Sequence, residues 1–579
     1  MVSRKKLAVS IGVVAVAAIS LLAASWAGAQ GKAQTLPRDQ SLITSGTAWG
    51  PESNFNPFGG GWATGMVGLV NETLLRFDPL KDKYIPWLAS SAKFVGAKYV
   101  IKVRSGVKFS NGKALTGKVV ASDIKLGKHK TAFWNVLFNR IKTTKVKGNT
   151  ITITFKGKPS YIQWQNLMFN MPIVWPAQFA SITDATFTTM GSTPGWKPIG
   201  TGPYALDTAA SDPTTGVVWK KRAAKSWWAA AKKVAPSPAP TYVQDLVNTS
   251  NTNALEGLLT KIEDLNNNYL PGVQNLVSKG QAQTYFKAAP YHLSANTAWL
   301  EVNTTKKPMN DAKFRLALAQ AVNVSKIVGS GDYNGLVGVA NQTGLLKVWS
   351  KYVNKTQMNK LGFKHSVAAA KATLAKSGYK VGSNGFVTNK DGSKLQLTIE
   401  VPSGWSDWEA ARSIIVSSER SAGIDVVVKT GSQAQVQTTN RNQGAFDLQV
   451  DNAYQISDNP WTYFNGIFHQ PIINGGTGQT FANFGRYTNN TAWSLVKKLD
   501  QTPPSNLKGR KAILSQLQKI ELTQLPIIPL WYNGIWAQTQ SKYWTNWPSA
   551  ASNRHYLTCM WGGYLQMTGI DTITHLKKA

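Results

Sequence analysis

The clearest periodic pattern of apolar residues in the chain lies between residues 308 and 322. Pro308 cannot extend a helix backwards, and the side chain of Asn310 or Asp311 can accept hydrogen bonds from the free amides of a first turn. The pattern therefore predicts an amphipathic helix that begins near Asp311 and buries one face. The apolar residues that recur at helical spacing on this face are Phe314, Ala317, Leu318, Ala321 and Val322.

Other segments show shorter patterns. Apolar and polar residues alternate over residues 99–103 and 151–155, which predicts strands with one buried face. Residues 366–378 predict a helix that ends at a glycine. The Gly-, Asn- and Pro-rich residues 30–70 predict a short strand that runs into a loop, and the basic residues 219–240 predict a long loop.

A loop, a helix and a strand are predicted in succession after residue 402. Ser406 or Asp407 can cap a helix that runs to about Arg420, and Gly423 can end it. Residues 424–429 then begin a strand. Such units recur in α/β lobes, and no repeat of 20 to 50 residues points instead to a solenoid or a propeller.

Five segments of the chain carry recognisable motifs in a fixed order. They are RSGVKFSNGKALT (104–116), GTGPY (200–204), LTKIED (259–264), KPMNDAKFRLALAQAVN (307–323) and QLPIIPL (524–530). All five resemble segments of the extracytoplasmic solute-binding proteins of ABC importers, in the dipeptide/oligopeptide-binding family, also called solute-binding protein family 5. The resemblance extends over almost the whole chain after the N-terminal segment.

The resemblance implies an α/β, periplasmic-binding-protein-like fold. Two α/β lobes would be joined by hinge strands and would enclose the ligand between them, and an additional domain would be inserted in the first lobe. The expected first lobe comprises residues 30–70, 200–290 and 521–579. The inserted domain would be residues 71–199 and the second lobe residues 291–520.

The same resemblance implies a function. The protein would be a monomeric receptor that captures an oligosaccharide or oligopeptide outside the cytoplasmic membrane. It would deliver this small-molecule ligand to an ABC permease that cytoplasmic ATPase subunits drive, with no covalent chemistry and no cofactor.

The N-terminal residues have the three parts of a secretory signal peptide. Arg4, Lys5 and Lys6 precede an apolar run over residues 7–24, and small residues follow it. Residues 1–29 are thus predicted to be a signal peptide, with the alternative that the apolar run is retained as a membrane anchor. No cysteine stands at the cleavage site for lipidation, so we expect a periplasmic or cell-surface-associated protein.

The chain is strongly basic, with 64 Lys plus Arg against 28 Asp plus Glu and a formal net charge of +36. The basic residues are spread along the whole chain and accompany no nucleic-acid-binding motif, so we do not expect nucleic acid as a partner. Attraction to an anionic cell envelope, either wall polymers or lipid headgroups, explains the same charge and agrees with export.

No catalytic or metal-binding constellation is visible in the sequence. The six histidines are scattered, and there is neither a G-x-S-x-G elbow nor a P-loop. The single cysteine, Cys559, cannot form an internal disulfide or a metal cluster alone. We therefore expect no enzyme, although a wall-bound polysaccharide-active enzyme is the alternative from another class.

Tryptophan is unusually frequent, with 22 residues, and several of them stand in loops marked by Gly or Pro. An indole offers a flat apolar face and one donor, which suits a sugar ring or a peptide side chain. The predicted ligand-binding residues are Trp49, Trp405, Trp461 and Trp531 for stacking, with Asn452 and Tyr454 as polar groups.

The class of ligand depends on one loop. Peptide-binding members of the family anchor the ligand's ammonium group with an aspartate, and the matching position here is Ile456, although Asp458 or Asp451 could substitute. Residues 404–408 and 459–463 resemble segments of the family's cellobiose and oligosaccharide binders. An oligosaccharide is therefore favoured, and an oligopeptide remains the alternative.

Overall fold

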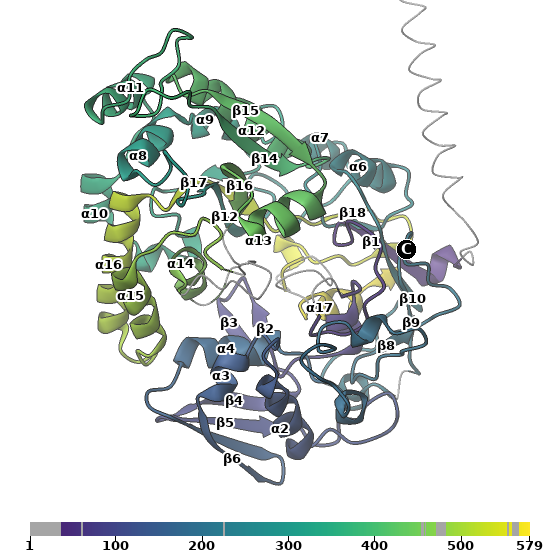
Figure 1. Cartoon of the computed structure of the whole chain (residues 1–579). Helices are drawn as coiled ribbons and strands as arrows, with labels where there is room; N and C mark the ends of the chain where they lie inside the picture. Colours follow the sequence, from purple (N-terminus) through teal and green to yellow (C-terminus); the bar gives the residue numbers. More distant parts are fainter. Residues whose placement is uncertain are drawn as a thin grey trace, which may run out of the picture.

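The structure is a computed structural model, and it describes residues 36–59, 62–223, 226–452, 457, 459–470, 482–552, 555–557 and 567–579. Three sheets of four or more strands organise the described residues (Figure 1). The first and second sheets form the two α/β lobes, and the third belongs to a smaller domain at the lower end of the molecule in this view.

The first sheet has the strand order β18-β11-β1-β10-β9-β8. Its centre is parallel, because β1 runs parallel to both β10 and β11. The helices α6 (Asn251–Leu259) and α7 (Val273–Ser278) flank β11 in the chain. The strands are β1 (Ser41–Ser45), β8 (Tyr204–Leu206), β9 (Val218–Lys221), β10 (Tyr242–Leu246), β11 (Leu265–Asn266) and β18 (Gln538–Thr539).

The second sheet has the order β13-β17-β12-β16-β14-β15, with β14 parallel to β15 and β16. Its long strands are buried along almost their whole length, as expected for a sheet covered by helices on both faces. The strands are β12 (Ser294–Val302), β13 (Gly338–Val339), β14 (Leu397–Pro402), β15 (Val426–Gly431), β16 (Leu448–Asn452) and β17 (Ile527–Gly534).

Helices of the second lobe surround this sheet (Figure 1). They are α8 (Ala312–Ala321), α9 (Val324–Val328), α10 (Lys355–Leu361), α11 (Val367–Lys376), α12 (Ser406–Ser421), α13 (Arg441–Gln443), α14 (Trp461–Phe468), α15 (Asn490–Asp500) and α16 (Leu507–Gln524).

The third sheet is antiparallel throughout, with the order β4-β5-β7-β6. It belongs to the smaller domain, together with the hairpin β2 (Leu75–Asp78) and β3 (Lys83–Pro86). Its strands are β4 (Ala89–Val95), β5 (Lys98–Val103), β6 (Ile141–Lys147) and β7 (Thr150–Phe155), and its helices are α2 (Gly117–Lys125), α3 (Asn135–Asn139) and α4 (Tyr161–Asn170).

The chain returns from the second sheet to the first directly after β17. Ile535 N donates to Leu293 O (2.7 Å) and Gln283 N donates to Thr539 O (2.8 Å), so the outgoing and returning crossings between the lobes lie side by side. The remaining short elements are α5 (Trp228–Ala231), α17 (Gly569–Ile573), β19 (Trp544–Thr545) and β20 (Lys577–Lys578).

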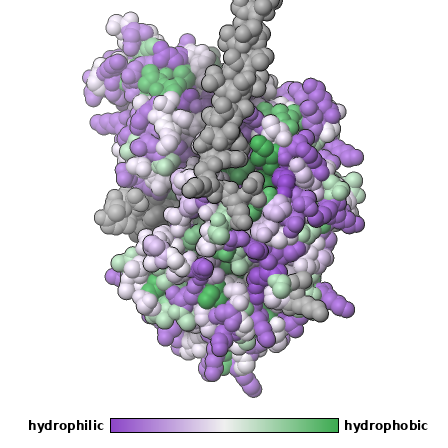
Figure 2. Space-filling view, turned by 90° about the vertical axis from the view of Figure 1, so that its right-hand side faces the viewer, coloured by the Kyte–Doolittle hydropathy of each residue, from purple (hydrophilic) through white to green (hydrophobic). Residues whose placement is uncertain are grey.

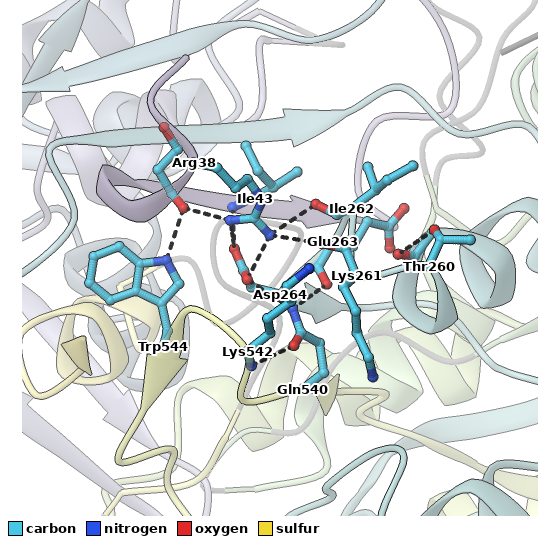
Figure 3. A network of polar contacts seen from close by, with 12 residues as sticks. Arg38, Ile43, Thr260, Lys261, Ile262, Glu263, Asp264, Gln540, Lys542 and Trp544 are labelled. Carbon is cyan, nitrogen blue, oxygen red and sulfur yellow. Dashed lines mark hydrogen bonds and ion pairs between the residues drawn. The ribbon is translucent and has the colours of Figure 1, made fainter. Parts of the chain in front are cut away.

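A network around Arg38 ties the beginning of the described chain to the rest of the first lobe (Figure 3). Its guanidinium binds both carboxylate oxygens of Asp264, with N–O distances of 2.9 and 2.8 Å. The backbone amide of Ile43 and the side-chain amide of Gln540 also donate to this carboxylate. Asp264, the last residue of the LTKIED motif, thus joins β1, β11 and the C-terminal segment.

The local predictions are confirmed for most elements. Strands β5 and β7 and helix α11 lie where their patterns predicted them, and α8 has Asp311 as its N-cap, accepting from Lys313 N. Helix α12 and strand β15 also follow the prediction, to within two residues at the start of the strand.

Three expectations differ from the structure. Residues 219–240 are not one loop, because most of β9 and all of α5 lie within them. Neither Ser406 nor Asp407 caps α12, whose N-cap position is Trp405 without a side-chain cap. The first lobe does not resume at residue 521, since α16 continues to Gln524 and β17 pairs with β12 in the second sheet.

Hydrophilic residues cover most of the face shown in Figure 2, and the hydrophobic residues on it form small separate patches. Among the residues that the structure describes, no helix has both the length and the apolar character needed to cross a bilayer. The predicted signal peptide over residues 1–29 lies outside the described residues.

Candidate functional site

A cavity of about 430 Å³ opens between the first and second sheets. The first lobe contributes residues that follow β1 and β11, and the second lobe contributes residues at or after the ends of β14, β15, β16 and β17. The lining residues are Gly46, Thr47, Trp49, Asn251, Asn267, Asn268, Tyr269, Trp405, Asp407, Trp408, Gln433, Gln437, Asn452, Asn533, Gly534, Ile535 and Trp536.

The position of the cavity follows from the sheet topology. In open α/β sheets, ligands bind outside the carboxyl ends of the strands, where loops from separate strands converge. Strands β1 and β11 are parallel in the first sheet, and β14, β15 and β16 are parallel in the second. Their carboxyl ends therefore place loops from both lobes around one cavity.

Aromatic side chains form one wall of the cavity. Trp49 of the first lobe faces Trp405 of the second, with ring centroids 5.4 Å apart. Trp405 packs edge-on against Trp408 at 4.9 Å. On the other side, Tyr269 and Trp536 form an edge-to-face pair at 5.5 Å. Half-buried indoles at the mouth of such a cavity offer flat apolar faces to a ligand.

The polar wall consists mainly of amide side chains. Within the described residues, Oδ1 of Asn267, Asn268 and Asn533 and Nε1 of Trp405 are buried and have no hydrogen-bond partner. Buried polar atoms are normally satisfied, so partnerless ones on a cavity wall mark positions where a ligand or water can bind. Together they supply three acceptors and one donor.

The side chain of Asn268 lies so close to the backbone at position 46 that only glycine fits there. Its φ is +102°, and a Cβ added there would lie 2.0 Å from Oδ1 of Asn268. A larger residue would both strain the backbone and push this acceptor away. The structure therefore requires glycine at position 46, directly after β1.

Asp407 is the single carboxyl group among the described lining residues, and no Lys, Arg or His is among them. Its two oxygens accept hydrogen bonds from Asn251 Nδ2 (3.1 Å) and from Tyr333 Oη (2.9 Å). Burial raises the pKa of Asp407 to about 7. The cavity is thus close to neutral, and its one carboxyl group already has protein partners.

The two lobes touch at the rim of this cavity. Asn251 N donates to Gly404 O (3.0 Å), and its side chain reaches Asp407. Asn251 begins α6 in the first lobe, whereas Gly404 and Asp407 flank the start of α12 in the second. Together with the contact of Trp49 and Trp405, these bonds hold the lobes together on one side of the site.

Because several carboxyl groups are buried, we expect the free energy of unfolding to fall as pH rises from about 6.5 to about 8.5. Burial raises the pKa of Glu263 and of Glu301 to about 8, and that of Asp407 to about 7. The folded protein therefore binds protons more tightly than the unfolded chain, and unfolding becomes easier as these protons are lost. Buried His292, with its pKa lowered to about 3, affects stability only below this window.

Thermal unfolding measured across this pH range should show a falling midpoint. The variant Asp407→Asn removes one contributing group without a change of shape, so its midpoint should fall less steeply, because each unit of raised pKa corresponds to about 1.4 kcal/mol. A midpoint that rises from pH 6.5 to pH 8.5 would contradict the prediction.

The structure brings three of the six predicted ligand-binding residues together. Trp49, Trp405 and Asn452 line the cavity. Trp531 is fully buried in β17, behind Trp408, and Trp461 is 7% exposed with its indole N–H donating to Val496 O. Neither of these two lines the cavity. Tyr454 lies outside the described residues, as do Ile456, Asp458 and Cys559.

Sequence reasoning missed the amide wall. Asn267 and Asn268 belong to the run Asn266-Asn267-Asn268, which begins two residues after the end of the LTKIED motif, and this run is the signal that could have revealed them. Asp451, a predicted substitute for the peptide anchor, is 2% exposed and pairs with Arg441 Nη1 at 3.1 Å. Within the described residues, this carboxylate is already engaged.

The model of the family described as bacterial extracellular solute-binding proteins, family 5, matches residues 83–475 of the chain. A probable ABC transporter-binding protein of Deinococcus radiodurans is 23% identical over 544 residues, which cover 86% of this chain and 87% of that protein. The nickel-binding periplasmic protein of Escherichia coli is 24% identical over 72% of this chain and 78% of its own.

Solved structures agree with this assignment. A periplasmic oligopeptide-binding protein of an oligopeptide ABC transporter from Thermotoga maritima, with mannohexaose bound, has a TM-score of 0.87 and 32% identity, covering 94% of this chain and 99% of that one. The oligopeptide-binding protein of Bacillus subtilis in complex with a nonapeptide has a TM-score of 0.72 and 18% identity, covering 93% and 99%. The chain therefore belongs to family 5 of the bacterial extracellular solute-binding proteins and is the substrate-binding component of an ABC transporter.

Proposed function

We propose that the protein captures an oligosaccharide in the cavity between its lobes and delivers it to the permease. The chemistry of the cavity wall is the observation that carries this proposal. Indoles from both lobes stand beside buried amide oxygens without partners. Sugar rings present apolar C–H faces for the indoles and hydroxyl groups that can donate to these oxygens.

An oligopeptide with free ends would need charged partners at its ammonium and carboxylate groups, since a buried charge is costly unless it is paired. The described lining offers no cation for the carboxylate. Asp407 is the one lining carboxyl group, and Asn251 and Tyr333 already donate to it. These features favour a neutral ligand.

Among the similar structures, the Thermotoga protein bears on both classes of ligand. The Thermotoga protein, at 32% identity, holds mannohexaose although it is named as an oligopeptide-binding protein. The Bacillus protein holds a nonapeptide, and its 18% identity supports the fold alone. An oligopeptide is therefore the second candidate, and the resemblance of residues 404–408 to oligosaccharide binders adds weight to the first.

The chain from Gln30 onward, screened by thermal unfolding against manno- and cello-oligosaccharides and against short peptides, tests the proposal. A ligand at a hundred times its Kd stabilises the folded state by about 2.7 kcal/mol, so its binding raises the unfolding midpoint. We expect a rise with an oligosaccharide and none with peptides.

A rise with peptides alone would overturn the ligand class. A high tryptophan content would also suit a wall-bound polysaccharide-active enzyme. Analysis of the sugar recovered after incubation distinguishes such an enzyme from a receptor. A receptor must return the oligosaccharide at its original length, whereas shortened products would show that the protein is an enzyme.

A further inference from the structure

We propose that the outward face of the third sheet docks on a membrane surface that carries anionic lipid headgroups. Along each strand, residues on this outward face alternate with residues on the buried face. Ala92, Tyr99, Ile101, Ile151 and Ile153 point into the core. The residues that lie between them on these strands, with their counterparts on β6, form the outward face, which we call the lysine face: Lys93, Val95, Lys98, Val100, Lys102, Lys145, Lys147, Thr150 and Thr152.

Strand register places these side chains in rows across the sheet. Lys93 pairs with Val100, which pairs with Thr152, which pairs with Lys145. In the neighbouring row, Lys102 pairs with Thr150, which pairs with Lys147. Strands in a sheet are about 4.8 Å apart, so the rows form a broad array of cations that extends across the sheet.

The charge of this part of the chain is of one sign. Residues 89–160 contain sixteen Lys or Arg and a single acidic residue, Asp123. Asp123 is fully buried, and burial raises its pKa well above the usual range, so it does not offset the surface charge. All fourteen lysines of this segment are exposed, and none of them forms an ion pair with another described residue.

Exposed apolar side chains favour a lipid surface over a soluble polyanion. Val95, on the lysine face itself, is 57% exposed. Val100, which lies on the same face, is partly exposed. Surfaces that bind membranes combine cations for the headgroups with a few apolar groups for the acyl boundary. An array of cations that is several strands wide also suits an extended surface better than a linear chain.

Docking through the lysine face would leave the ligand cavity free. Figure 1 shows the third sheet at the lower end of the molecule, whereas α6 and α12, which flank the cavity, lie in its upper half. The proposal thus assigns different surfaces to the membrane and to the ligand. The net charge of the whole chain predicts attraction to an anionic cell envelope. The proposal assigns this attraction to one surface of the protein.

Vesicle co-sedimentation of the chain from Gln30 onward tests the proposal, because this chain keeps every described residue and lacks the apolar N-terminal run. The vesicles are phosphatidylcholine alone, or phosphatidylcholine with one third phosphatidylglycerol. Each lysine at an anionic surface contributes about fivefold to partitioning. The variant Lys93→Gln, Lys102→Gln, Lys145→Gln, Lys147→Gln should therefore lose on the order of a hundredfold or more.

The matched control removes the same charge from the exposed residues of α10 and α11, through Lys355→Gln, Lys360→Gln, Lys371→Gln and Lys376→Gln. We expect this control to bind anionic vesicles almost as the parent does, and we expect no chain to bind pure phosphatidylcholine. Unfolding midpoints of both variants, compared with the parent, verify that they are folded.

Equal loss in the two variants would show that net charge alone matters and would overturn the proposal. Binding to soluble polyphosphate without binding to anionic vesicles would overturn it as well, since the partner would then be a linear polyanion.

Discussion

Replacing Arg38 with alanine is expected to lower the free energy of unfolding by about 3–5 kcal/mol, because it removes one partner of a buried ion pair. The carboxylate that would lose its partner belongs to Asp264, whose side chain has no exposed surface. Removing one member of such a pair leaves the other charge buried without compensation. That cost exceeds the strength of the ion pair itself.

Arg38 binds Asp264 in the two-pronged geometry that a guanidinium offers a carboxylate (Figure 3). Its Nη1 and Nη2 also donate to Ser41 O (3.0 Å) and Ile262 O (3.1 Å). The alanine variant therefore loses bonds to β1 and to the turn before β11 as well. We expect the first lobe to loosen where the N-terminal strand enters its sheet.

The stability that Arg38→Ala loses should depend on pH. The pKa of Asp264 is raised to about 6 by burial, although Arg38 lowers it. Without Arg38 this pKa should rise further, so Asp264 would take up a proton at mildly acidic pH and the unpaired charge would disappear. The difference in stability between parent and variant should thus be largest near pH 8 and shrink toward pH 5.

Denaturant unfolding of the parent, Arg38→Ala, Arg38→Lys and Lys578→Ala measures these effects. Arg38→Lys keeps the charge but cannot bind both oxygens in the same way, so its loss should be intermediate. Lys578 pairs with Asp39 at the surface, with both side chains more than half exposed, so Lys578→Ala should unfold like the parent. An Arg38→Ala variant as stable as the parent would contradict the prediction.

Local periodicity was sufficient to predict individual elements. Helix α8 begins at a proline- and aspartate-marked start and buries one face, and both features are properties of neighbouring residues. The pairing of elements across the chain is not local. Strand β17 shows this, since its motif is adjacent in sequence to the first-lobe segment but its hydrogen bonds are to β12 in the second lobe.

The site was predicted in part for the same reason. Trp49 and Trp405 stand in Gly-marked loops and line the cavity, but Trp461 and Trp531 have similar surroundings in sequence and are buried. A tryptophan beside Gly or Pro can lie either on the cavity wall or in the core, because its burial depends on which distant element covers it. Asp407 is a second example. Its position in the sequence suggested that it caps α12, but its side chain instead accepts hydrogen bonds from Asn251 and Tyr333.

Replacing Trp405 with alanine is expected to weaken oligosaccharide binding by about 1–3 kcal/mol, or roughly fivefold to 150-fold in Kd, with little effect on folding. Trp405 is half-buried at the cavity wall and is the second-lobe partner of Trp49. A ligand that lies between the lobes would contact both indoles when the lobes close, so truncating either one removes stacking surface.

The variant Trp405→Phe separates two contributions of this residue. Phenylalanine keeps a flat ring but has no indole N–H, and Nε1 of Trp405 is a buried donor without a partner among the described residues. If that donor binds a ligand hydroxyl, Trp405→Phe should lose part of the affinity, about 0.5–1.5 kcal/mol. Equal affinity of Trp405→Phe and the parent would limit the role of Trp405 to stacking.

Trp493→Ala provides the matched control for calorimetric titration, because Trp493 on α15 is also half-buried but packs against His469 and does not line the cavity. The two alanine variants should unfold at similar temperatures, yet only Trp405→Ala should bind the oligosaccharide weakly. If both variants bind like the parent, the ligand does not lie against the indoles of this cavity.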